Sequence, residues 1–235
     1  MRTQPYLKEI ILSVVTLIWI LFVATNVDQT LGIIYHEFLV IGLLLLIIAT
    51  FVFKDKSVIT FQAQPGGTLK ALLIGFIGWI ALIFTSVLAL QIIDPAHATL
   101  ASVLTLMGAT TPALANSKWA NWFTFSLAVP YAETQLWARM TEFFADVFHI
   151  NITSRRIGGG LLVLLLVMSI GFAIFHLTAK GVTNAPALAI VAIMMLISLI
   201  IIIWQQETRA AVYMHMVANG IASYISLFST GSLQV

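Results

Sequence analysis

Long apolar runs separated by short polar links make up most of this chain. A helix needs ~18–20 apolar residues to cross a lipid bilayer. Seven runs approach or exceed that length, and they cover residues 10–25, 31–53, 69–93, 122–148, 157–178, 185–204 and 210–228. The pattern predicts an all-α fold, a polytopic transmembrane helical bundle of about seven to eight helices.

The stretch at residues 98–115 is ambiguous, because it is long enough to cross but rich in hydroxyl groups. If it does not cross, one side of the membrane collects most of the basic residues, as the positive-inside rule expects. That side then holds Arg2, Lys8, Lys54, Lys56, Lys70, Arg155, Arg156 and Arg209, and the other holds Lys118 and Lys180. We favour seven spans with a cytoplasmic N-terminus, and whether residues 98–115 cross stays open.

Composition supports a membrane location. Sixty per cent of the residues are apolar and 9% are charged, against about 25% charged residues in an average soluble domain. The formal net charge of +2 gives no indication of a nucleic-acid partner, and the absence of cysteine excludes disulfides and thiolate metal sites. We expect an integral protein of the cell membrane whose surroundings are the lipid bilayer.

Polar side chains inside the apolar runs are concentrated in the second half of the chain. They are Glu133, Arg139, Glu142, Asp146, His176, His215 and Asn219. An ionisable group in the bilayer interior is costly, so it usually faces a partner or a water-filled cavity. The sequence therefore predicts scaffold helices in residues 1–118 and the helices that carry function in residues 119–235, within one integral membrane unit.

Three local patterns stand out among these residues. Glu133 follows Pro130 by three positions, and Phe172 precedes His176 by four. His215 and Asn219 are also four residues apart, which places both on one face of a helix.

In this order the patterns resemble the CPBP family of intramembrane proteases, also called the CAAX-protease or bacteriocin-processing (ABI) family, whose members include metalloprotease-like proteins. Its motifs are EExxxR, FxxxH and HxxxN. The second and third are intact here, whereas the first is degraded. Thr134 stands where the second glutamate would be, and Ala138 stands where the arginine would be, one residue before Arg139.

The resemblance implies a glutamate-type endopeptidase that hydrolyses a hydrophobic or membrane-anchored peptide without a cofactor. Glu133 and His176 would activate the water, while His215 and Asn219 would form the oxyanion site. The general chemistry agrees, because hydrolysis needs a base for the water and donors for the oxyanion.

Two other interpretations remain open. The degraded first motif fits a catalytically inactive CPBP-like scaffold or an accessory subunit of a membrane complex. Alternatively, Glu133, His176 and His215 form a two-histidine, one-carboxylate set of the kind that holds zinc or iron.

The residues also predict some local geometry. Arg139 and Glu142 are spaced for a pair on one helix, and Phe172 is expected to support the ring of His176. One feature opposes a shared site: with a straight helix at residues 185–204, His215 is expected on the opposite side of the bilayer from His176.

Overall fold

The computed structural model describes residues 11, 13–16, 18, 67–108, 118–179 and 182–228, and the elements among them are helices. In chain order they are α3 (Gly67–Ile93), η1 (Pro95–His97), α4 (Leu100–Gly108), α5 (Lys118–Phe123), η2 (Thr124–Ala128), α6 (Val129–Val147), α7 (Gly159–Ala179), α8 (Ala185–Gln205) and α9 (Arg209–Phe228). The all-α prediction is therefore confirmed for the part of the chain that is described.

Four of these helices are long and apolar enough to cross a membrane, namely α3, α7 over Gly159–Leu177, α8 and α9. They correspond to four of the predicted spans, and the chain is an integral membrane protein. Helix α6 is not among the four, since its 19 residues include four charged side chains. Of the run at 98–115, α4 contains nine residues, and residues 109–117 lie outside the described part. The predicted span 31–53 and most of 10–25 lie outside it as well.

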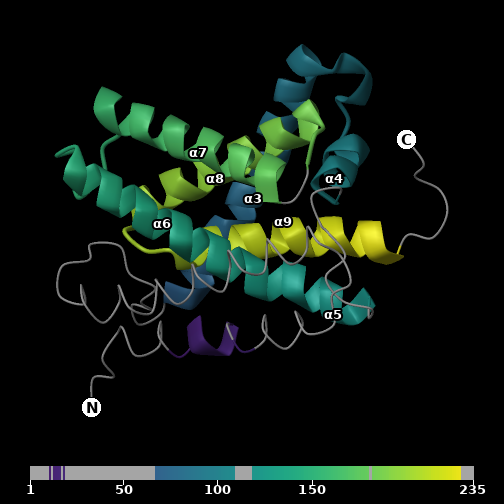
Figure 1. The fold of residues 1–235 in the computed structure, drawn as a ribbon, viewed down its shortest axis with the longest axis horizontal. Coiled ribbons are helices and arrows are strands. Elements are labelled where there is room, and N and C mark those ends of the chain that lie inside the picture. The colour runs from purple at the N-terminus through teal and green to yellow at the C-terminus, as the bar shows by residue number, and fades with distance from the viewer. Residues whose placement is uncertain are drawn as a thin grey trace.

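Helix α9 is at the centre of the described bundle. It packs against α3, α4, α6 and α8 and against η2, and it runs antiparallel to α6 in Figure 1. The approach of α3 to α9 is close at Gly75, where an added Cβ would stand 2.7 Å from the backbone oxygen of Ala210. A small residue lets the two backbones approach, which is a common way for membrane helices to associate.

A π-helical turn, η2, interrupts the helical segment that leads into α6. Pro130 is the second residue of α6, two positions after the end of this turn. Proline has no N–H to donate and its ring crowds the carbonyl four residues earlier, so a helix that continues through proline must open locally. Both η2 and the preceding α5 pack against α9, and Trp122 Nε1 of α5 donates to the carbonyl of Gly220 in α9 at 2.9 Å.

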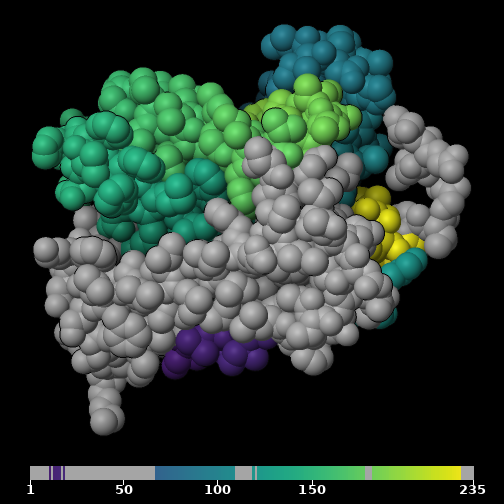
Figure 2. All heavy atoms as spheres, in the orientation of Figure 1, coloured from purple at the N-terminus to yellow at the C-terminus, as the bar shows by residue number. Residues whose placement is uncertain are grey.

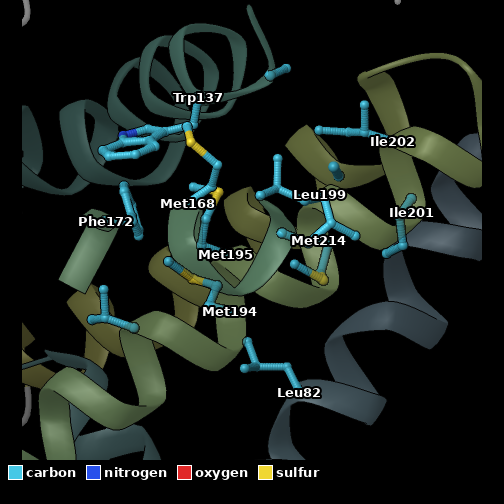
Figure 3. Close-up of a cluster of buried hydrophobic side chains, with 14 of the residues drawn as sticks. Leu82, Trp137, Met168, Phe172, Met194, Met195, Leu199, Ile201, Ile202 and Met214 are labelled. Carbon is cyan, nitrogen blue, oxygen red and sulfur yellow. The ribbon is translucent and has the colours of Figure 1, made fainter. Parts of the chain in front are cut away.

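The interior contains many methionines. Figure 3 shows Met168, Met194, Met195 and Met214 between Leu82 and Trp137. Methionine is unbranched and fills irregular gaps between tilted helices.

Large apolar side chains also lie on the outside of α3 and α7, for example Ile77 and Val163. In Figure 2 the side chains of α6 and α7 cover the upper left of the visible face, and those of α3, α4 and α8 cover its upper right.

Candidate functional site

Three of the four predicted site residues meet inside the bundle. Oε1 of Glu133 on α6 lies 4.0 Å from Nε2 of His176 on α7. Oε2 of the same carboxylate lies 3.6 Å from Nε2 of His215 on α9. All three side chains are at least 98% buried. A carboxylate between two imidazoles thus joins three helices that are far apart in the sequence.

The fourth predicted residue, Asn219, is half-buried one turn after His215. Among the residues that the structure describes, no hydrogen bond joins its side chain to Glu133, His176 or His215. Its backbone carbonyl accepts a hydrogen bond from the hydroxyl of Ser223. The site that the geometry defines therefore consists of Glu133 and the two histidines.

The ring of His176 is fixed by residues of its own helix. Its Nδ1 atom lies 2.9 Å from the carbonyl oxygen of Phe172. Because a carbonyl can only accept, Nδ1 carries the proton of this bond and Nε2 is the acceptor in the neutral ring. The Phe172 ring lies against the His176 ring with centroids 4.4 Å apart and an angle of 64°. The expectation that Phe172 supports His176 is confirmed.

His215 is fixed by Thr134, a residue that the sequence presented only as a departure from the family motif. Thr134 Oγ1 lies 3.0 Å from Nδ1 of His215, and this contact is buried. The next residue of α6, Gln135, donates from Nε2 to Thr208 Oγ1 at 2.7 Å. Three consecutive residues of α6 therefore contact either a site histidine or Thr208, the residue just before α9. The only sequence feature that could have indicated this role of Thr134 was its hydroxyl group, next to a glutamate expected to be buried.

Phe172 also forms an apolar wall for the site. Its ring is fully buried, and its centroid lies 5.4 Å from that of Trp137 and 6.4 Å from that of His215, both in edge-to-face arrangements. Figure 3 shows Trp137 and Phe172 facing each other at one end of the methionine-rich core. Such aromatic packing limits rotation of the imidazoles and surrounds them with low-dielectric material.

The expectation that His215 lies on the opposite side of the bilayer from His176 is wrong. It assumed a straight helix at residues 185–204, whereas both imidazoles lie within 4.0 Å of the carboxylate of Glu133. In the structure both α7 and α9 pack against α6, and their histidines meet at Glu133 in the first half of α6. Tilt and stagger are set by packing between helices, which the apolar pattern does not encode.

The remaining charged residues of α6 lie apart from this site. Arg139 Nη1 pairs with Glu142 Oε2 at 3.0 Å, as their i, i+3 spacing predicted. As for metal binding, no group of three His, Cys, Asp or Glu side chains within the described residues has an arrangement suited to hold an ion.

Comparison with known proteins identifies no relative of this chain. No protein-family model, no curated protein and no solved structure matches the chain. The resemblance to the CPBP family therefore depends on the motif residues themselves, and membership stays a prediction.

Proposed function

We propose that this chain is a CPBP-like intramembrane endopeptidase of the glutamate type, acting on a hydrophobic or membrane-anchored peptide. The observation that carries the proposal is the position of Glu133 between His176 and His215, buried and contributed by three different helices. A buried carboxylate with two imidazoles is expensive to maintain for packing alone. It also supplies the acid–base groups that hydrolysis requires.

The distance between Glu133 and His176 suits activation of a water molecule. Two acceptors 4.0 Å apart can each accept a hydrogen bond of ~2.8 Å from the same water, with an angle of about 90° at its oxygen. That angle is close to the one between the two O–H bonds of water. A water held in this way has its lone pairs directed away from both acceptors and towards a substrate.

In the proposed reaction the water oxygen bonds to the carbonyl carbon of the scissile peptide. The Glu133–His176 pair takes the water's proton and later donates it to the leaving amine as the C–N bond breaks. His215 stabilises the oxyanion from Nε2–H, in the tautomer that has the Thr134 hydroxyl donating to Nδ1. Asn219 would join the oxyanion site by a change of its side-chain rotamer after substrate binding.

The finer topology belongs to the same proposal. Seven spans, a cytoplasmic N-terminus and a location in the cell membrane are what the positive-inside rule favours for this sequence. Lys70, Arg155 and Arg209 support that orientation, because they line one pocket at a single end of the bundle.

The proposal is tested with the full chain reconstituted in lipid vesicles. The probe is a library of lipid-anchored and hydrophobic peptides, incubated in ¹⁸O-labelled water. Hydrolysis places ¹⁸O in the new carboxyl terminus, which mass spectrometry detects. We expect Glu133→Gln to lower the cleavage rate by about 10²-fold or more, since general acid–base groups contribute 10²–10⁴-fold.

Glu142→Gln is the matched control, because it changes another glutamate of α6 that pairs with Arg139 outside the site. It should retain the cleavage rate of the unchanged protein. Full activity in folded Glu133→Gln protein contradicts the proposal. Loss of activity with chelators and recovery with zinc or iron would instead indicate a metal-dependent reaction.

One observation favours the second candidate, a catalytically inactive scaffold or accessory subunit of a membrane complex. Thr134 occupies the position of the family's second glutamate and is engaged with His215. Under this interpretation the buried cluster fixes helix packing only. The unchanged protein would then cleave no peptide of the library, and Glu133→Gln would lower its thermal stability without a change in cleavage.

A further inference from the structure

A polar pocket of about 350 Å³ lies at one end of the bundle, apart from the buried Glu133 cluster. Its walls come from the start of α3, the loop between α6 and α7, the end of α8 and the start of α9. The charged residues that line it are Lys70, Arg155, Arg209 and Glu207, and the lining also includes Trp204 and Gly67. The volume falls within the ~300–1,000 Å³ of pockets that bind small ligands.

Arg209 forms the fixed part of this pocket. Its side chain is almost fully buried, and Nη2 lies 2.6 Å from Oε2 of Glu207. Gly67 makes room for the guanidinium, because an added Cβ at that position would stand 2.8 Å from Nη2. The Arg209–Glu207 pair carries no net charge. It therefore organises the wall of the pocket, and other residues determine the sign of the pocket's charge.

Lys70 and Arg155 give the pocket its positive charge. Both side chains are exposed, and neither forms an ion pair with any residue that the structure describes. Counting only the residues that the structure describes, these two cations beside the neutral pair give the pocket a net charge of about +2. Such a concentration of positive charge attracts anions, and phosphate oxygens are good acceptors for guanidinium and ammonium groups.

The pocket has the position of a membrane–water boundary. Trp204 ends α8 with 57% of its surface exposed, and tryptophan is enriched at the level of lipid headgroups. The apolar faces of α3 and α8 begin immediately beyond it. Basic pockets between transmembrane helices at this level bind the headgroups of anionic lipids.

From these observations we infer that the pocket at Lys70, Arg155 and Arg209 binds a phosphate group, presented by an anionic lipid headgroup or as free phosphate. The site is independent of the proposed proteolysis. It would hold the start of α3, the start of α9 and the α6–α7 loop together at one face of the membrane.

Calorimetric titration of the detergent-solubilised full chain tests this inference. One arm uses a short-chain phosphatidylglycerol, the second uses inorganic phosphate, and a short-chain phosphatidylcholine controls for binding of the acyl chains. We expect saturable binding of phosphatidylglycerol, weakened about fivefold by Lys70→Gln and by Arg155→Gln. That factor corresponds to about 1 kcal/mol per basic residue near a phosphate.

Arg156→Gln is the matched control, because Arg156 is the exposed neighbour of Arg155 and does not line the pocket. Its binding should equal that of the unchanged protein. Inorganic phosphate binding as tightly as the lipid would identify free phosphate as the ligand, with the site unchanged. Two results overturn the inference: no saturable binding of either anion, or equal weakening by all three substitutions.

Discussion

Oε2 of Glu133 lies 3.6 Å from Nε2 of His215. The next residue of α6, Thr134, is 81 positions away from the same histidine in the sequence and also contacts it. Two adjacent residues of α6 thus approach the two nitrogens of one imidazole. The carboxylate faces Nε2 and the hydroxyl of Thr134 contacts Nδ1. This arrangement fixes both the position of the ring and its rotation, which is what a preorganised donor or base requires.

Thr134→Val is expected to impair the reaction because it removes the hydroxyl while keeping a similar shape. His215 would lose its Nδ1 partner, and a lost neutral hydrogen bond costs about 1 kcal/mol of stability. If the ring position matters for chemistry, the cleavage rate should fall about tenfold or more, with kcat affected more than KM. Steady-state kinetics in vesicles give both values.

Thr134→Ser provides the control for that prediction, since serine keeps the hydroxyl. It should restore most of the rate. A Thr134→Val protein with the kcat of the unchanged chain would show that the contact with His215 has no part in catalysis.

Phe172→Leu is expected to lower the cleavage rate by more than its loss of thermal stability accounts for. The Phe172 ring contacts both histidines of the site, so a smaller side chain leaves both imidazoles with more freedom. Phe125→Leu is a suitable comparison, because Phe125 is equally buried but lies in η2. Both variants should lose a similar amount of thermal stability, and Phe172→Leu alone should lose about tenfold or more in rate. Equal rates in the two variants would contradict a positioning role for Phe172.

Helix positions could be predicted from the sequence because lipid imposes long apolar runs. The predicted span 185–204 corresponds to α8, whose ends carry recognisable signals. Asn184 accepts a hydrogen bond from the backbone N–H of Ala187 at the start, and Gln206 adopts the left-handed conformation after the end. Such local capping and length signals need no knowledge of neighbouring helices.

The convergence of the site could be predicted only in part. The i, i+4 spacing placed Phe172 and His176 on one helix face, which the structure confirms. Where α9 lies in the bundle depends on contacts such as that of Gly75 in α3 with Ala210, and those contacts join segments distant in the sequence. The role of Thr134 depends on the same packing. The spacing of side chains within one helix gives no information about how that helix packs against another.

Arg139→Gln should leave proteolysis within about twofold of the unchanged rate. Arg139 pairs with Glu142, and both side chains are partly exposed, away from the Glu133 cluster. Partly exposed ion pairs contribute about 0–1 kcal/mol, so the thermal midpoint should move little. Activity lost by more than tenfold would instead mean that Arg139 takes the role of the family's motif arginine from one position further along the helix.

Gly75→Ala is expected to destabilise the fold, because the new methyl group would meet the backbone of α9. Its Cβ would stand 2.7 Å from the carbonyl oxygen of Ala210 and 3.0 Å from the backbone nitrogen of Met214. Backbone atoms in a packed helix cannot move aside without separating α3 from α9, and such overpacking costs about 1–3 kcal/mol.

Gly160→Ala is the matched control, since it makes the same change in α7 at a position with nothing within 4 Å of the new Cβ. Alanine also has the better helix propensity, by roughly 1 kcal/mol. Thermal unfolding of both variants in the same detergent should show a lower midpoint for Gly75→Ala and an unchanged or higher midpoint for Gly160→Ala. If both midpoints move in the same direction by the same amount, the close approach of α3 to α9 does not hold the bundle together.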